Sequence, residues 1–318
     1  MKKTLKTTQN SGISVVFFGN ERIATGVSTV CPTLTKLLES GYKVLAVVVN
    51  NEQSASRNRR ELEVADVAAR YEIPLLAPKN PQDIMGQLRD YQADIGVLVS
   101  YGRIVSQEMI DLFPGGIVNI HPSLLPLHRG SAPIESAILH GNTKTGVSLM
   151  QLSKEMDAGN VYAYSEYELH GNEQKQTLAD TLLELGSEMV VMTLPRILRG
   201  EIIGRPQDDA GATYDKHITK QDGRIDLAKS AIQLEREVRA YLGWPGSRTI
   251  IAGKDVVVTA AHVADNSVEN VGKKSTFVAN KQLCLQTADG ILVIDTLKPA
   301  GRPAMPATAF LAGHAKYL

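Results

Sequence analysis

The sequence has few cysteines and no long apolar run, and both absences limit the kind of protein it can be. Cys31 and Cys284 are too few for a disulfide framework and have no metal-ligand spacing. We expect two reduced, buried thiols. No stretch approaches the roughly 20 apolar residues that a membrane-spanning helix needs, and the basic residues 1–10 lack the apolar core of a signal peptide. We therefore expect a flexible tail over residues 1–11 and a cytoplasmic protein with no membrane partner.

Two nucleotide-binding fingerprints are also missing. The turn after the first predicted strand begins Gly-Asn-Glu-Arg-Ile at Gly19, so it lacks the G-x-G-x-x-G that cradles a pyrophosphate in dinucleotide-binding domains. The NTP-binding motif G-x-x-x-x-G-K-[ST] occurs nowhere in the sequence. None of the 7 histidines has metal-ligand spacing, so we expect no metal site.

The sequence does contain short apolar runs separated by helical patterns. Such runs are typical of strands in a parallel sheet that is covered on both faces. A length of 318 residues favours two domains, and 43% apolar and 21% charged residues are ordinary for a globular chain. We predict an α/β fold with a Rossmann-like parallel sheet in the N-terminal part, built from strands near residues 13–18, 42–49, 93–100 and 116–121.

A polar pair interrupts the last of these strands. Asn119 and His121 are two residues apart, so both point to the same side of the strand. Packing requires no such pair, and open α/β sheets bind ligands beyond the carboxyl ends of their strands. Together an Asn and a His can stabilise negative charge on a carbonyl oxygen and transfer a proton near neutral pH. The pair is therefore a candidate catalytic site of unspecified type.

A histidine in such a role needs a carboxylate for orientation or charge. Asp157, in Met-Asp-Ala-Gly, is the next isolated carboxylate in a suggestive setting. An aspartate before a small-residue turn more often caps that turn locally. From the residue pattern alone, both roles for Asp157 stay open.

The spacing of the whole set resembles the formyltransferases that use 10-formyltetrahydrofolate, over residues 12–200. The motifs are Asn-x-His-x-Ser-Leu-Leu-Pro from Asn119, then Arg129-Gly130, Pro133, Thr145-Gly146-Val147 and Met156-Asp157-Ala158-Gly159. The resemblance implies 10-formyltetrahydrofolate as co-substrate and a catalytic trio of Asn119, His121 and Asp157. It also implies a folate pocket lined by Tyr101, Gly102, Ser123, Leu124, Leu125 and Pro126.

The C-terminal part resembles the C-terminal domain of the methionyl-tRNA formyltransferase family. The matching motifs are Tyr-x-x-x-Ile-x-Lys-x-Asp-Gly-x-Ile-Asp from Tyr214, Arg239-Ala240 and the Trp-Pro-Gly turn at Trp244. The resemblance implies an OB-like β-barrel used on tRNA, which the short β-rich segments and a small excess of Lys and Arg after residue 211 suit. We predict a monomer with a formyltransferase domain over 12–203, a linker over 204–212 and a tRNA-binding domain over 213–318. Initiator methionyl-tRNA is the predicted partner.

Several residues depart from the family pattern. Leu127 and His128 stand where relatives usually have a basic and a larger aromatic residue, and Glu135 stands where a Gln is usual. The polar loop after the second strand is short, and it is either a mobile loop leading into a helix or a basic loop that orders on a phosphate backbone. On the second interpretation, Arg57, Arg59 and Arg60 of this loop contact tRNA. Arg129, after the Ser-Leu-Leu-Pro turn, is a further predicted tRNA contact.

The donor chemistry alone does not decide the acceptor. A sugar-nucleotide N-formyltransferase would use the same folate donor, and an assay with different acceptors would distinguish it. A catalytically inactive folate- or RNA-binding protein is a third interpretation. The intact set of Asn119, His121 and Asp157 argues against that third class.

Overall fold

A computed structural model describes residues 12–50, 62–265, 267–270 and 274–318 of the protein. Its contacts divide the chain into two units. Unit 1 contains Met1–Pro133, Lys144–Glu168 and Leu178–Asp215, whereas unit 2 contains Ile134–Thr143, Leu169–Thr177 and Lys216–Leu318. The segment 204–212, predicted as a linker, is thus part of unit 1. Within the described residues, no helix is both long and apolar enough to cross a bilayer.

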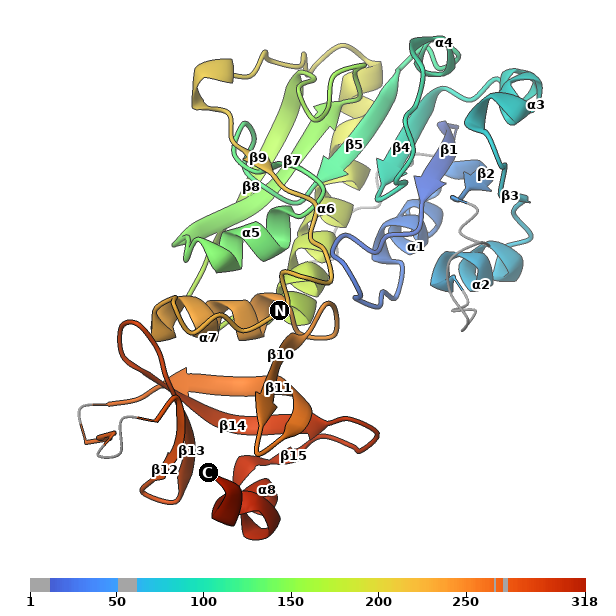
Figure 1. The fold of residues 1–318 in the computed structure, drawn as a ribbon. Coiled ribbons are helices and arrows are strands. Elements are labelled where there is room, and N and C mark those ends of the chain that lie inside the picture. Colours follow the sequence, from blue (N-terminus) through green and yellow to red (C-terminus); the bar gives the residue numbers. More distant parts are fainter. Residues whose placement is uncertain (1–11, 51–61, 266, 271–273) are drawn as a thin grey trace, which may run out of the picture. The chain divides into compact units, whose positions relative to one another are not determined.

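A seven-stranded sheet in the order β3-β2-β1-β4-β5-β7-β8 forms the centre of unit 1 (Figure 1). The first five of these strands pair in parallel, which confirms the predicted Rossmann-like sheet. Strands β1, β4 and β5 are almost wholly buried, so their continuous apolar sequences reflect burial on both faces. These strands span Ser14–Gly19 (β1), Lys43–Val48 (β2), Leu75–Leu76 (β3), Ile95–Val99 (β4) and Ile117–His121 (β5).

The other edge of this sheet is antiparallel. Strand β7 (Lys144–Gln151) pairs antiparallel with β5, and β8 (Val161–Glu168) pairs antiparallel with β7. Sequence reasoning did not predict β8, because its residues Val-Tyr-Ala-Tyr-Ser-Glu-Tyr-Glu carry charges and polar groups rather than a buried apolar run. This is the composition of an edge strand, which has one side toward solvent.

The helices of the N-terminal part are short except for α6 (Lys175–Leu198), which continues through Pro195. Helix α6 lies along the sheet behind β5 and β7 (Figure 1). It approaches β5 closely at Gly186, where a Cβ atom would lie 2.6 Å from Cγ2 of Ile120. The remaining helices are α1 (Pro32–Glu39), α2 (Glu63–Arg70), the 3-10 turn Pro81–Ile84, α3 (Met85–Tyr91), α4 (Gln107–Ile110) and α5 (Pro133–Leu139).

Unit 2 is built on an antiparallel half-barrel. Its strands follow the order β10-β11-β14-β13-β12, with β15 beside β14. Leu234 of helix α7 (Ala231–Ala240) and Phe310 of helix α8 (Ala307–His314) pack into its apolar core. The strands are Ser247–Ile251 (β10), Lys254–Val263 (β11), Thr276–Ala279 (β12), Gln282–Gln286 (β13), Ile291–Pro299 (β14) and Met305–Pro306 (β15). The predicted small β-rich domain is confirmed.

Candidate active site

Asn119 and His121 lie at the carboxyl end of β5, as predicted. They are 7% and 4% exposed, so two polar side chains are buried in an otherwise apolar strand. Among the described residues, the Asn119 side-chain amide has no hydrogen-bond partner. A nearly buried amide without a protein partner is available to bind a ligand.

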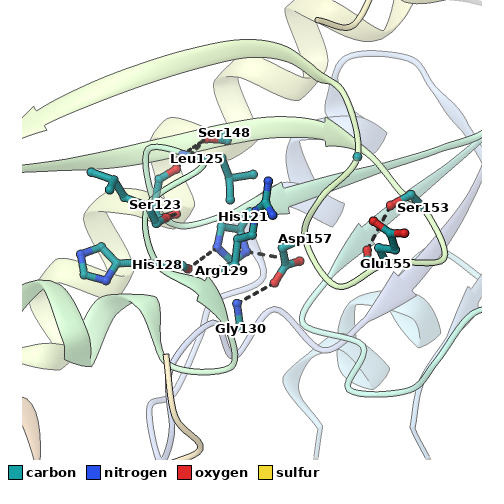
Figure 2. Close-up of polar contacts among 12 residues, drawn as sticks. His121, Ser123, Leu125, His128, Arg129, Gly130, Ser148, Ser153, Glu155 and Asp157 are labelled. Atoms are coloured by element: carbon teal, nitrogen blue, oxygen red, sulfur yellow. Dashed lines mark hydrogen bonds and ion pairs between the residues drawn. The ribbon is translucent and has the colours of Figure 1, made fainter. Parts of the chain in front are cut away.

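The backbone sets the tautomer of His121. Its Nε2 donates a hydrogen bond to the carbonyl oxygen of His128 at 2.9 Å. The proton of the neutral ring is therefore on Nε2, which leaves the lone pair on Nδ1. Nδ1 faces Oδ1 of Asp157 at 3.7 Å (Figure 2). When Nδ1 accepts a proton, the carboxylate stabilises the resulting positive charge.

Asp157 is held by residues far from its own turn. Its Oδ2 accepts a hydrogen bond from the backbone N–H of Gly130 at 2.9 Å (Figure 2). Its backbone carbonyl accepts a second from Nε2 of Gln207 at 2.8 Å. The residue has φ 50, in the left-handed region. The carboxylate thus bridges His121 and Gly130 instead of only capping the local turn.

The Ser-Leu-Leu-Pro turn is held by internal hydrogen bonds. Ser123 Oγ donates to the carbonyl of Leu127 at 2.6 Å, while Ser148 Oγ donates to the carbonyl of Ser123 at 2.6 Å. The N–H of Leu125 donates to Ser148 Oγ at 3.0 Å, and the Leu125 side chain packs on Met150 and Val161. Buried Ser123 and Leu125 therefore shape the turn, whereas Leu124 and Pro126 are half-buried.

The other two predicted pocket residues follow β4. Tyr101 is buried, and its ring packs edge-on against Phe18 with centroids 5.7 Å apart. Burial raises the pKa of its phenol. Gly102 is exposed with φ +70, next to Arg103, whose Nε donates to Oδ1 of Asn50 at 2.6 Å. Only the glycine of this predicted pair presents surface to a ligand.

A cavity of about 540 Å³ lies beside the turn that carries Asp157. Residues of α4, of the end of β7 and of the segment 151–160 line it, including Ile110, Gln151 and Lys154. None of the six residues predicted for the folate pocket lines this cavity.

Arg129 does not occupy the surface position that its predicted tRNA contact requires. It is only 2% exposed, and its guanidinium donates to Oε1 of Gln207, Oδ1 of Asp209 and the hydroxyl of Tyr214. A buried guanidinium held by these internal acceptors is not presented at the surface, where a contact with a phosphate would need it. The prediction for Arg129 is therefore corrected. Arg57, Arg59 and Arg60 lie outside the described residues.

Leu127 and His128, two of the departures from the family pattern, have different surroundings. Leu127 is 42% exposed. His128 has φ 58, and its Nδ1 lies 3.1 Å from Oδ1 of the buried Asp215. Its N–H donates to Oγ1 of Thr213 at 2.7 Å. Sequence reasoning did not identify Gln207 or Asp215, because no local motif connects them to residues 128–157.

The described residues contain no cluster of three or more His, Cys, Asp or Glu side chains that could hold a metal ion. The polar groups around β5 are instead a hydrogen-bond donor, a base and a carboxylate. Such a set can deprotonate a nucleophile and stabilise an oxyanion.

Comparison with known proteins identifies the family. The formyl transferase family model matches residues 15–194, and the formyl transferase C-terminal domain model matches residues 217–315. The chain belongs to the formyl transferase family. A curated relative from Roseiflexus castenholzii, named methionyl-tRNA formyltransferase, is 34% identical over 95% of this chain and 96% of its own length. The family predicted from the motifs is confirmed.

Solved structures share the fold at lower sequence identity. HypX from Aquifex aeolicus in complex with tetrahydrofolic acid matches with a TM-score of 0.64 and 20% identity. The match covers 95% of this chain but 47% of that one, so the chain spans about half of HypX. An N-formyltransferase from Helicobacter canadensis, solved with folinic acid and dTDP-3-aminofucose, matches with a TM-score of 0.66 and 18% identity over 89% of this chain and 98% of that one.

Proposed function

We propose that the protein transfers the formyl group of 10-formyltetrahydrofolate to the α-amino group of methionyl-initiator tRNA. The observation that carries this proposal is the pairing of His121 with Asp157 beside the unpartnered amide of Asn119. It is supported by a relative of nearly equal length that bears the name methionyl-tRNA formyltransferase.

The reaction begins with the amine attacking the formyl carbon. The amine loses a proton as its bond to carbon forms, and Nδ1 of His121 is the nitrogen with a lone pair to receive it. Asp157 stabilises the imidazolium that forms. The carbonyl oxygen acquires negative charge, and the side-chain amide of Asn119 donates a hydrogen bond to it.

The tetrahedral intermediate then collapses as the bond between the formyl carbon and N10 breaks. N10 leaves with the electron pair of that bond and takes a proton, which His121 returns. The products are the formylated amine and tetrahydrofolate, and His121 is neutral again. His121 thus acts first as a general base and then as a general acid, and no step of this reaction uses a metal.

Folate binding at the exits of β4 and β5 is part of the same proposal. The neighbour solved with tetrahydrofolic acid supports a folate donor in this fold. We place the folate against Gly102 and the turn residues Leu124 and Pro126, because these have surface to offer. Tyr101, Ser123 and Leu125 are buried, so in this proposal they support the residues that contact the folate.

An acceptor assay tests the proposal directly. The enzyme is given formyl-labelled 10-formyltetrahydrofolate with methionyl-initiator tRNA, methionyl-elongator tRNA or an amino-sugar nucleotide in parallel reactions. We expect label on the initiator tRNA. Label on the sugar nucleotide alone would support the second candidate, which the N-formyltransferase neighbour and the departures at Leu127 and His128 favour. Absence of label on every acceptor would overturn both.

A further inference from the structure

The segment 207–215 crosses both parts of the chain that form the candidate active site. It follows α6 and contacts residues 126–130 on one side and the turn at 157–159 on the other. We propose that this segment, which we call the strap, positions the catalytic pair, with Gln207 and Asp215 as positioning residues. The proposal rests on the function assigned to His121 and Asp157 above.

Gln207 anchors the strap to Asp157. Its Nε2 donates to the backbone carbonyls of Asp157 and Gly159, each at 2.8 Å. Its Oε1 accepts from Nε and Nη2 of Arg129 at 3.1 and 2.8 Å. The Gln207 amide therefore makes hydrogen bonds through both its nitrogen and its oxygen, and it links the turn of Asp157 to Arg129.

Arg129 fixes the other end of that amide. Its Nη2 also donates to Oδ1 of Asp209 and its Nη1 to the hydroxyl of Tyr214, both at 2.7 Å. The acceptors are Gln207 and Asp209 near the start of the strap and Tyr214 near its end, so the buried guanidinium contacts both ends of the strap. A buried cation with several fixed acceptors has little freedom to move.

Close backbone approach completes the arrangement. Arg129 and Gly130 (β6) pair in parallel with Tyr214 and Asp215 (β9). Gly130 has φ +113, and a Cβ atom there would lie 2.9 Å from the carbonyl oxygen of Asp215. The same glycine donates its N–H to Oδ2 of Asp157. The strap thus sets the position of the donor that orients the catalytic carboxylate.

Asp215 anchors the strap to His121 through His128. The buried carboxylate lies 3.1 Å from Nδ1 of His128, and Thr213 accepts the His128 N–H. These two contacts fix a residue whose backbone is in the left-handed region. The carbonyl of that residue is the group that receives the Nε2–H of His121. The strap therefore contacts the groups that hold both members of the catalytic pair, His121 and Asp157.

The first experiment compares single-turnover kinetics of Gln207→Glu with wild type. The substitution keeps an acceptor for Arg129 but removes the donor to Asp157 and Gly159. We expect the rate of formyl transfer to fall about 10- to 100-fold with KM for both substrates within twofold. Gln87→Glu, on the exposed face of α3, is the matched control and retains the wild-type rate. An unchanged rate in Gln207→Glu would overturn the proposal.

A double-mutant cycle separates positioning from general loss of structure. If Gln207 acts through Asp157, Gln207→Ala slows the wild-type enzyme but has no further effect in an Asp157→Asn background. Additive losses would show that Gln207 acts elsewhere and would overturn its role. Asp215→Asn, which keeps an oxygen acceptor for His128, is expected to restore most of the rate lost in Asp215→Ala. Equal losses in both Asp215 variants would overturn the role of Asp215.

An NMR measurement tests the positioning role of the strap independently of the proposed formyl transfer. Ring ¹⁵N chemical shifts, assigned with a His121→Gln variant, report the tautomer of His121 whether or not any acceptor is formylated. We expect the Nε2–H form in wild type and a mixture of tautomers in Asp215→Ala. The same tautomer population in both proteins would overturn the strap, whereas failure of the acceptor assay alone would overturn only the assigned reaction.

Discussion

The side-chain amide of Asn119 lies at the carboxyl end of β5, in the candidate active site. Its nearly buried position and lack of a partner among the described residues indicate a role in binding rather than in packing. Asn119→Ala removes one donor to the oxyanion without breaking an internal hydrogen bond. We expect transfer to slow by about 10²- to 10³-fold while the melting temperature stays within a few degrees. Unimpaired single-turnover transfer in this variant would exclude the oxyanion role.

A second buried group, Glu21, has a structural role that depends on pH. Its carboxylate accepts the backbone N–H groups of Thr33 and Leu34 at 2.9 and 2.8 Å, in the first turn of α1. The residue before this helix, Cys31, provides no side-chain cap. Glu21 therefore serves as a remote cap for α1. Burial raises its pKa from 4.5 to about 7, although the two backbone hydrogen bonds lower it in part.

The raised pKa of Glu21 predicts a loss of stability with rising pH. Between pH 4.5 and about 7 the unfolded chain releases a proton that the folded protein retains. The contribution of Glu21 to the free energy of unfolding therefore falls across this window, by up to about 3 kcal/mol, and is constant above it. Urea unfolding of wild type and Glu21→Gln at pH 5 and pH 7.5 measures the effect. The decline should be smaller in the variant, and equal declines in the two proteins would contradict the assignment.

At the scale of elements, helix α6 packs against β5, the strand that carries Asn119 and His121. Gly186 allows the helix to approach Ile120, the residue between Asn119 and His121. Gly186→Ala places a methyl group 2.6 Å from Ile120 Cγ2 and 3.2 Å from Val147 Cγ1, where a buried strand cannot easily move.

We therefore expect Gly186→Ala to destabilise unit 1 by about 1–3 kcal/mol and to reduce activity. Gly86→Ala in α3 is the matched control, because nothing lies within 4 Å of a Cβ atom at that position. There the better helix propensity of alanine should raise stability by up to about 1 kcal/mol. Chemical denaturation of both variants tests the comparison, and equal effects would show that propensity rather than packing decides.

At the scale of the whole molecule, we assign catalysis to unit 1 and propose that unit 2 contributes to tRNA binding. The trio lies in unit 1, and the C-terminal half-barrel contains a modest excess of Lys and Arg. Binding of a polyanion such as tRNA should therefore weaken as salt rises, whereas binding of the folate should depend less on salt.

Arg57, Arg59 and Arg60, which lie outside the described residues, are the proposed phosphate contacts. Replacing all three with Gln should raise KM for tRNA, reduce the slope of log K against log salt by up to about 3, and leave folate affinity unchanged. Arg199→Gln is a suitable control, because this exposed arginine is already paired with Glu201. Filter binding across a salt series gives the slopes. Loss of affinity for both substrates in the triple variant would indicate misfolding instead.

The sequence by itself determined the buried parallel strands β1, β2, β4 and β5, the position of the polar pair and the family. Buried strands have a local signature, because burial on both faces requires consecutive apolar residues. Asn119 and His121 could be recognised as candidate site residues because they are polar residues within such an apolar run. Strand β8 was not predicted, since an edge strand with one side toward solvent has no such run.

Only the tertiary structure decided what surrounds that pair. Gln207 meets Asp157 across 50 positions and Asp215 meets His128 across 87, and contacts at such separations leave no periodic trace in the sequence. Arg129 was predicted to contact tRNA, but its guanidinium is buried and donates to Gln207 and Asp209, which belong to a segment predicted as a linker. Composition and spacing determine which groups a chain possesses. Their partners depend on how distant segments pack, and here that packing directs Asp157 toward His121 and Arg129 away from solvent.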